Sequence, residues 1–413
     1  MYWKIILIAL LTVGRAYRMI LNILQYRSAN NPTPQNVADV YDSETYTRWK
    51  SYNAEKSRLA IISTALSFVA MLILLLTGAY PAAASILSAN LYTQMLAVIV
   101  FDALVSTLIN VGFGYVETMV IEQKYGFNRS SVKTFVIDQI RNLLLEIALS
   151  FFLGFALALL HQWLGNWVIL LFAAVVFGFS LVISFLYPIF SRIGNKFTPL
   201  PDGELKDRLM ALLTKHGYHV KAIEVMDASR RTTKLNAYFT GFGKLKTIVL
   251  YDNLVNNMSA DEICAVFAHE LGHGLHRDVL KQQIMNIGNM LLMSVIIWGA
   301  VSTPELHTAF GFGSVNYGFA YIALGIALSI VSPFISMITS AYSRHAEYRA
   351  DRQAVEEGCG EALISGLKKL AKENFADLAP NRALVILEYS HPPLSERIDA
   401  IEKALDSKKD QAK

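Results

Sequence analysis

Two histidines four residues apart mark the part of the sequence best suited to metal chemistry. The stretch FAHELGHGLHRD, from Phe267 to Asp278, places His269 and His273 one helical turn apart, with Glu270 directly after the first. An α-helix turns about 100° per residue, so the two imidazoles point the same way and could bind one Zn²⁺ together. Glu270 would lie beside the ion, where a carboxylate can act as a general base on water. The spacing is typical of hydrolytic zinc sites.

The residues before the histidines favour a helix. Ser259 is followed by the acids Asp261 and Glu262, as at the first turn of many helices. An apolar stripe then follows at helical spacing: Ile263, Val266, Phe267 and Leu271. The alternative is a solvated helix that carries two unrelated histidines.

A catalytic zinc ion normally has three protein ligands, so a third must come from elsewhere in the chain. The stretch SAYSRHAEYRADRQAVEEG predicts a helix with Glu347 and Asp351 four residues apart on one face. Glu347 would complete a His₂Glu set, and Asp351 could accept the second ring N–H of a ligand histidine. His345 competes as a ligand, but it lies about 200° from Glu347 around the helix. An ordinary solvated helix remains the alternative.

The composition indicates a membrane protein. Of the 413 residues, 54% are hydrophobic and only 17% are charged. The net charge of +4 is spread along the chain, which gives no reason to expect a nucleic-acid partner. Cys264 and Cys359 give no basis for a disulfide, and Cys264, off the histidine face, is interpreted as core packing.

Seven stretches are long and apolar enough to cross a hydrocarbon core, which takes about 20 helical residues. They span roughly residues 3–24, 59–79, 92–116, 143–161, 167–187, 284–302 and 318–340. Arg15 and Arg18 interrupt the first, which is unlike a cleaved signal peptide, so we interpret it as a span. We therefore expect an N-terminal membrane domain, residues 1–187, with five spans, and a zinc metallopeptidase domain, residues 188–413, with two more.

The positive charges predict the orientation in the membrane. The loops after the first and third spans are rich in Lys and Arg, whereas the loops after the second, fourth and sixth have none. The N-terminus is therefore expected outside the cytosol and the C-terminus within it. The block from Pro188 to about Gln283, which carries the histidines, is expected to be cytosolic.

This block also predicts a small α+β domain. A helix is expected from about Gly203 to His216, and KAIEVMDAS and KTIVLYDNL are typical of strands, with NAYFTGFG between them as a strand and turn. A small sheet before the histidine helix is similar to the layout of zinc proteases, in which an edge strand pairs with an extended substrate.

Taken together, HELGH and SRHAEYRAD resemble the paired zinc motifs of the CAAX prenyl protease family, which are integral-membrane zinc endopeptidases. Further similar segments occur in the family order: DSETYTRWKSYNAEKSRL, EQKYGFNRSSVKTF, GNKFTPLPDGELKDRL, KLNAYFTGFGKLKTIVLYDNL and YSHPPLSERIDAI. HELGH alone occurs in many metalloproteases, but the combination is far more specific. The similarity extends along nearly the whole chain.

The resemblance implies a role for each matching residue. The zinc ligands would be His269, His273 and Glu347, with Glu270 as general base and Asp351 behind the ligands. In HPPLSER, His391 would stabilise the oxyanion and Arg397 would lie near Glu347 and Asp351, while Asn236 and Ala237 would lie on the substrate-binding edge strand. From its residues alone, HPPLSER is more typical of a turn into the last helix, with Arg397 as a surface charge.

The resemblance also implies a mainly α membrane fold, in which seven transmembrane helices enclose a water-filled chamber with zinc near its cytosolic end. Such a chamber would accommodate the membrane charges Arg15, Arg18, Asp102 and Glu146; snorkelling or pairing between helices is the alternative.

The implied substrates are prenylated or similarly hydrophobic proteins, cut after the lipidated cysteine. Membrane lipid is the other expected partner, and the location would be a bacterial inner membrane or the endoplasmic reticulum. The alternatives are a membrane quality-control zinc protease and a transporter with a regulatory metal site.

Overall fold

The long helices follow the apolar stretches of the chain. The computed structural model describes residues 2–87, 90–192, 195–240 and 247–411. Within them, six helical segments are long and apolar enough to span a membrane. These are α1 (Tyr2–Ser28), α2 (Ser43–Leu76), α4 (Leu91–Tyr115) with the π-helical η2 (Val116–Glu122), α5 (Val132–Leu164) with η3 (Gly165–Trp167), α10 (Asp278–Val301) and α12 (Tyr317–Glu356).

The fifth expected span coincides with α6 (Val168–Phe190). Its apolar part among the described side chains, Leu171–Ile183, is shorter than a membrane crossing requires. The count of seven therefore stays a prediction.

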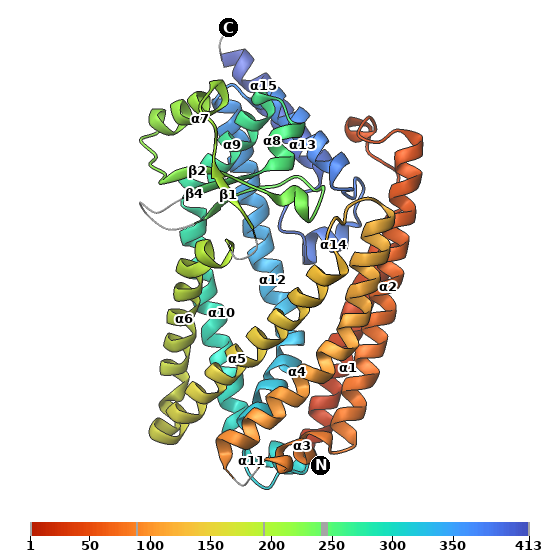
Figure 1. The fold of residues 1–413 in the computed structure, drawn as a ribbon, viewed down its shortest axis with the longest axis vertical. Helices are drawn as coiled ribbons and strands as arrows, with labels where there is room; N and C mark the ends of the chain where they lie inside the picture. Colours follow the sequence, from red (N-terminus) through yellow and green to blue (C-terminus); the bar gives the residue numbers. More distant parts are fainter. Residues whose placement is uncertain (1, 88–89, 193–194, 241–246, 412–413) are drawn as a thin grey trace.

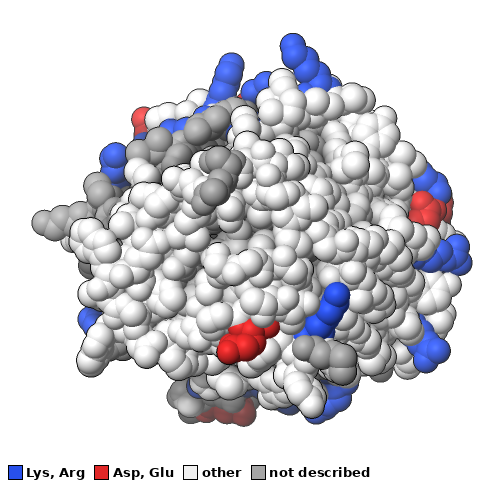
Figure 2. All heavy atoms as spheres, turned by 90° about the horizontal axis from the view of Figure 1, so that it is seen from below, with Lys and Arg blue, Asp and Glu red and all other residues white. Residues whose placement is uncertain are grey.

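The membrane-length helices and the expected catalytic block occupy opposite ends of the molecule. In Figure 1 the long helices fill the lower part of the view, with α5 running obliquely, and the sheet lies above them with α9 (Ala260–Leu275), α13 (Gly360–Glu373) and α15 (Leu394–Gln411). Seen from below, the lower face carries few charged side chains, as Figure 2 shows. The short helices α3 (Ala79–Ile86) and α11 (Pro304–Ala309) lie at this end.

The sheet has four strands in the order β1-β2-β4-β3. The strands β2 (Ala222–Met226) and β4 (Thr247–Tyr251) are parallel, while β1 (Phe197–Pro199) and β3 (Ala237–Thr240) pair antiparallel with them. The sequence predicted β2, β3 and β4 but not β1, and the predicted turn at residues 241–243 lies outside the described residues. β3 is an edge strand, so one side of it is open to pairing.

The remaining short elements connect the sheet to the helices. They are η1 (Gln35–Val37), α7 (Glu204–Lys215), η4 (Ala228–Arg230), α8 (Asp252–Asn257) and α14 (Arg382–Leu387). α7 coincides with the helix predicted near residues 203–216. The apolar faces of α7 and α9 pack on the sheet around Leu209, Leu213, Ile248 and Phe267, which are almost completely buried. This core holds α9 at a fixed position against β4 and β3.

A cavity of about 750 Å³ lies between α1, α2, the end of α4 and the segment 374–389. Arg15 and Arg18 line it, as expected for charges in a wet chamber, and Arg18 also pairs with Glu388 at 2.8 Å. Asp102 and Glu146 do not line this cavity, and Asp102 instead accepts a hydrogen bond from Tyr80 at 2.7 Å. In this fold, some charged side chains of the membrane helices therefore line a cavity, and others pair with polar groups of neighbouring helices.

Candidate metal centre

Close packing of α9 on α12 brings the two motifs together. A capping box between Ser259 and Glu262 begins α9, and the helix runs unbroken through His273. On α12, Ala350 faces Gly272 so closely that a Cβ on the glycine would lie 3.0 Å from the Ala350 Cα. Only glycine allows such an approach without displacing the neighbouring helix. The contact sets Glu347 opposite the two histidines.

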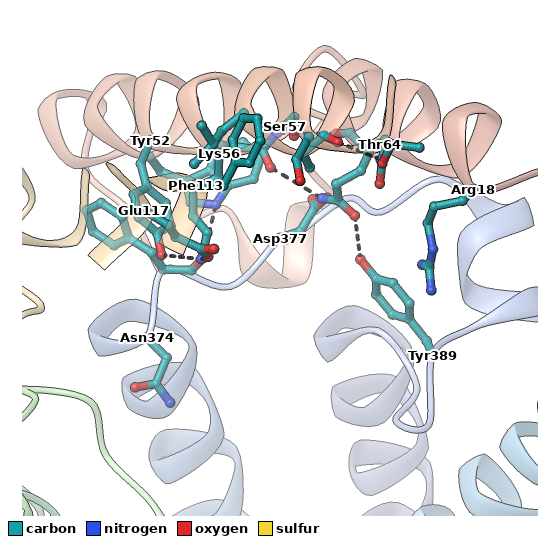
Figure 3. A pocket seen from close by; sticks show the side chains of 18 of the residues that line it. Arg18, Tyr52, Lys56, Ser57, Thr64, Phe113, Glu117, Asn374, Asp377 and Tyr389 are labelled. Atoms are coloured by element: carbon teal, nitrogen blue, oxygen red, sulfur yellow. Dashed lines mark hydrogen bonds and ion pairs between the residues drawn. The ribbon is translucent and has the colours of Figure 1, made fainter. Parts of the chain in front are cut away.

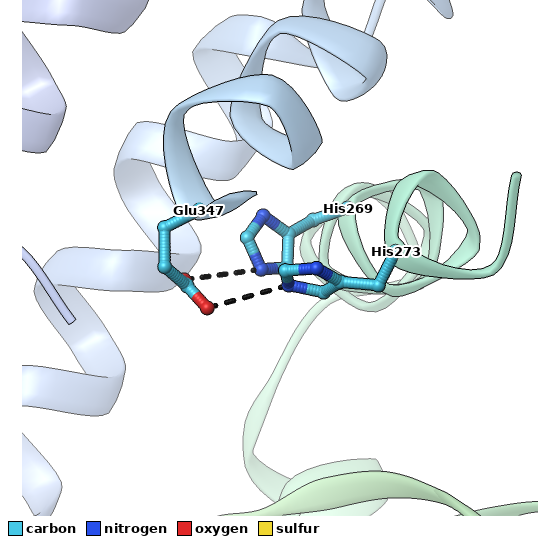
Figure 4. Close-up of side chains that lie close together, drawn as sticks. All are labelled: His269, His273 and Glu347. Carbon is cyan, nitrogen blue, oxygen red and sulfur yellow. Dashed lines mark ion pairs between the residues drawn. The ribbon is translucent and has the colours of Figure 1, made fainter. Parts of the chain in front are cut away.

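The three expected ligands form one cluster, shown in Figure 4. Ligand atoms of His269, His273 and Glu347 all lie within 4.8 Å of one another. His269 Nε2 lies 3.4 Å from Glu347 Oε2, and His273 Nε2 lies 3.3 Å from Glu347 Oε1. Glu347 Oε2 is buried and has no hydrogen bond among the described residues. Two imidazoles and a carboxylate with an unsatisfied buried oxygen suit a catalytic zinc ion.

A second layer of acids holds the outer nitrogens of the histidines. Asp351 Oδ1 lies 2.8 Å from His269 Nδ1, and Asp278 Oδ2 lies 3.0 Å from His273 Nδ1. Arg397 donates to both carboxylate oxygens of Asp351, at 2.6 and 2.9 Å, and its Nη1 lies 3.3 Å from Glu347 Oε2. Such contacts fix the tautomer and orientation of ligand histidines.

Asp278 is a residue that the sequence reasoning missed. It comes five residues after His273, beyond the end of α9, and it also accepts hydrogen bonds from Tyr342 and Arg349 at 2.8 and 2.6 Å. One indication of this role was present in the sequence, because in HGLHRD the acid Asp278 follows His273 by only five residues.

The carboxylates make the histidines basic in the metal-free protein. Burial alone would lower the pKa of His269, but the hydrogen bond with Asp351 and the nearby carboxylate of Glu347 raise it to about 9. Burial also opposes the charged form of His273, and Glu347 raises its pKa. Protons therefore compete with a metal ion for both imidazoles.

The remaining expected residues surround this cluster. Glu270 lines a narrow cavity of about 10 Å³ together with Ala237 and Tyr238 of β3. Asn236 precedes that strand and is exposed. His391 Nε2 lies 3.4 Å from Glu347 Oε1, with 64% of its side chain exposed. Glu270 is thus next to His269 in the chain and near β3, while His391 lies beside Glu347.

His345, the competing ligand, is not part of the cluster. Its side chain is exposed, whereas Glu347, two residues later, is buried. The cluster of His, Cys, Asp and Glu found among the described residues contains Glu347 instead.

The fold and the cluster define a membrane metallopeptidase, and comparison with known proteins gives the family. A model described as CAAX prenyl protease N-terminal, five membrane helices, matches residues 22–192, and peptidase family M48 matches residues 199–405. The chain belongs to peptidase family M48 and to its CAAX prenyl proteases, and is a multi-pass membrane metalloendopeptidase.

Relatives match over almost the whole chain. The CAAX prenyl protease 1 homolog of Oryza sativa subsp. japonica is 30% identical, covering 95% of this chain and 96% of the relative. The probable CAAX prenyl protease 1 of Schizosaccharomyces pombe is 32% identical, with 97% and 88% covered. The crystal structure of S. mikatae Ste24p superimposes with a TM-score of 0.90 at 26% identity, covering 97% of this chain and 99% of the other. These matches favour a prenyl protease over a quality-control protease or a transporter.

Proposed function

We propose that the protein is a zinc endopeptidase that cuts prenylated (CAAX) or similarly hydrophobic substrates near their C-terminus. The observation that carries this proposal is the His269, His273 and Glu347 cluster, which lies beside Glu270 and an open edge strand. The names of the relatives supply the substrate class.

One zinc ion per chain would be held by His269, His273 and Glu347. When bound, zinc acts as a Lewis acid on water and on the scissile carbonyl. Glu270 takes the proton from the attacking water and gives it to the departing amine. The Nε2–H of His391 donates a hydrogen bond to the oxyanion that develops on the substrate.

Other residues hold this arrangement in place. Asp351 and Asp278 orient the two histidines through their Nδ1 atoms, and Arg397 holds Asp351 and Glu347. Asn236 and Ala237 present the edge of the sheet to an extended substrate. Ala237 of β3 and Glu270 border the same narrow cavity, so a substrate paired along β3 would have its scissile bond next to Glu270.

We further propose seven spans enclosing a chamber, with the N-terminus outside or lumenal and the catalytic domain cytosolic. The membrane would be a bacterial inner membrane or the endoplasmic reticulum. A domain boundary near residues 187–188 is supported by family matches that end at residue 192 and begin at 199. A reporter fused after Lys413 should be cytosolic, and one inserted near Ser88 should lie on the opposite side of the membrane; both positions lie outside the described residues.

Incubation of the purified protein with a farnesylated peptide, with and without a zinc chelator, tests the function. We expect cleavage after the lipidated cysteine that stops when the chelator is added. The same sequence in a folded surface loop of a soluble protein should survive, because it cannot enter an enclosed chamber as a strand. Equal cleavage of the peptide without its lipid would remove the prenyl requirement, and cleavage that persists without metal would refute the zinc mechanism.

A further inference from the structure

The 750 Å³ cavity between α1, α2 and the segment 374–389 is separate from the metal cluster but borders the elements that flank it. None of the cluster residues line it. Figure 3 shows its wall, in which α2 carries Tyr52, Lys56, Ser57 and Thr64 while Asn374, Asp377 and Tyr389 come from the other side. Its size falls within the usual range of ligand pockets, about 300–1,000 Å³.

Asn374 connects this cavity to the edge strand. Its side-chain amide accepts from the Leu235 N–H at 3.0 Å and donates to the Leu235 carbonyl at 3.1 Å, as a paired strand would. Leu235 directly precedes Asn236 and Ala237, where β3 begins. A peptide paired with β3 would therefore reach Asn374 and the cavity as it leaves this end of the strand.

Tyr389 connects the cavity to the other side of the metal cluster. It lines the cavity and lies two residues before His391, so the two Cα atoms are within about 7 Å of each other. Through Asn374 and Tyr389, the cavity thus lies close in the chain to Asn236 and His391, the two groups expected to flank a bound substrate.

Arg15 gives the cavity an uncompensated positive charge. Arg18 pairs with Glu388 at 2.8 Å, and Lys56 pairs with Glu117 at 2.9 Å. Among the described residues Arg15 makes no hydrogen bond or ion pair. Arg15 lines the cavity without an ion pair among the described residues, so its guanidinium is available to an anionic group that enters the cavity.

The carboxylate of Asp377 does not supply that partner. Its Oδ2 accepts hydrogen bonds from Ser28 at 2.6 Å and from Gln25 at 3.2 Å, and its Oδ1 accepts from the Ala379 N–H at 3.1 Å. Gln25 lies ten residues beyond Arg15 on α1, which corresponds to about 15 Å along the helix. Asp377 is therefore at the opposite end of the cavity from Arg15.

The distance from the metal cluster to Arg15 follows from the packing of α1 on α12. Gly14 packs directly against Ser329, which lies 18 residues before Glu347 on the same helix. Eighteen helical residues span about 27 Å. An extended chain covers about 3.3–3.6 Å per residue, so it reaches the level of Arg15 about eight residues from the scissile bond.

We propose that this cavity receives the substrate segment upstream of the scissile bond, and that Arg15 selects for an acidic residue about eight positions before the cut. The inference rests on the proposed function, because a substrate cut near its C-terminus has only its upstream side long enough to reach Arg15.

Charge-matched peptides test the proposal. Farnesylated peptides should be identical except for Glu, Gln or Lys about eight residues before the scissile bond, and KM should be measured with the purified full-length protein. In the wild type, KM for the Glu peptide should be about fivefold lower than for the Lys peptide, the effect of one solvated ion pair. Arg15→Gln should abolish this preference, and Arg15→Glu should reverse it.

Three controls establish whether the charge preference comes from Arg15 itself. Arg58→Gln changes an arginine on α2 that does not line the cavity, so it should keep the wild-type preference. Arg15→Lys keeps the positive charge and should retain the preference for the Glu peptide. This variant serves as the test of charge if Arg15→Glu fails to fold. Moving the charged residue to two positions before the bond should make KM independent of Arg15.

Peptide binding to Glu270→Ala protein, followed by fluorescence anisotropy, provides a readout independent of turnover. A charge preference in binding that depends on Arg15 supports the cavity assignment even if the prenyl requirement fails in the cleavage assay. Identical Glu and Lys affinities in the wild type would overturn the inference. So would a preference unchanged by Arg15→Gln, or a KM that follows the anionic lipid content of vesicles instead of peptide charge.

Discussion

Asp278 provides the sharpest test of the proposed zinc centre, because its contact with the cluster is with the outer nitrogen of His273. Asp278→Asn keeps the size of the side chain and an oxygen that can accept from His273 Nδ1, but it removes the charge. Tyr342 and Arg349, which now donate to Asp278, hold that position in place. Loss of such an outer partner typically weakens metal binding 10- to 100-fold, or about 1.4–2.7 kcal/mol.

Zinc affinity should be measured by competition with a chelator on purified protein, with peptide cleavage followed at saturating zinc. Asp261→Asn is the matched control, since Asp261 lies on α9 but pairs with Arg208 at the surface. We expect a zinc affinity at least tenfold weaker for Asp278→Asn and unchanged for Asp261→Asn. Equal affinities in the two variants would mean that the contact with His273 has no influence on the metal.

Three further predictions concern single residues. Glu270→Ala should retain zinc while cleavage falls at least a hundredfold, because the base is lost and the ligands remain; zinc lost along with activity would assign Glu270 a different role. Glu347→Ala should lower the zinc content of the protein and His345→Ala should not, as metal analysis can show; the reverse would make His345 the third ligand. Burial alone would raise the pKa of Glu357, but hydrogen bonds with Lys215 and His216 hold it below its usual 4.5. The contribution of ionised Glu357 to stability is therefore present above pH 4.5 and lost as the pH falls through the lowered pKa. Glu357→Gln should destabilise the protein at pH 7 by about 1–2 kcal/mol and have no effect at a pH below that pKa. Denaturation of both proteins at the two pH values measures the difference.

Local geometry made the positions of the cluster residues predictable from the sequence. His269 and His273 share a face because they are four residues apart, and the same spacing links Glu347 to Asp351. Asp278 escaped this reasoning because the helix ends before it. Arg277 has φ of 56°, a left-handed conformation that is uncommon for residues other than glycine, and the chain turns there. Helical periodicity could not predict that the Asp278 side chain contacts His273.

The arrangement around the site depends on contacts that no pattern encodes. β1 has three residues and ends in Pro199, so its pairing with β2 had no alternating signal of its own. The contact of Asn374 with Leu235 joins residues 139 positions apart. Apolar length predicted where the membrane helices lie, but not which of their charges pair and which line the cavity.

α12 explains how the membrane domain and the metal centre maintain a fixed separation. The sequence suggested a span ending near residue 340 and then a helix bearing Glu347, but the structure has one continuous helix from Tyr317 to Glu356, with Pro333 inside it. Its apolar part contacts Gly14 of α1, and its C-terminal part carries Glu347 and Asp351. Because a helix has a constant rise, the contact with α1 and Glu347 are held at a set distance. Under the proposed function, a substrate chain bound across both would therefore be measured from the metal cluster, so a charge on α1 would act on one position of the substrate and not on its neighbours.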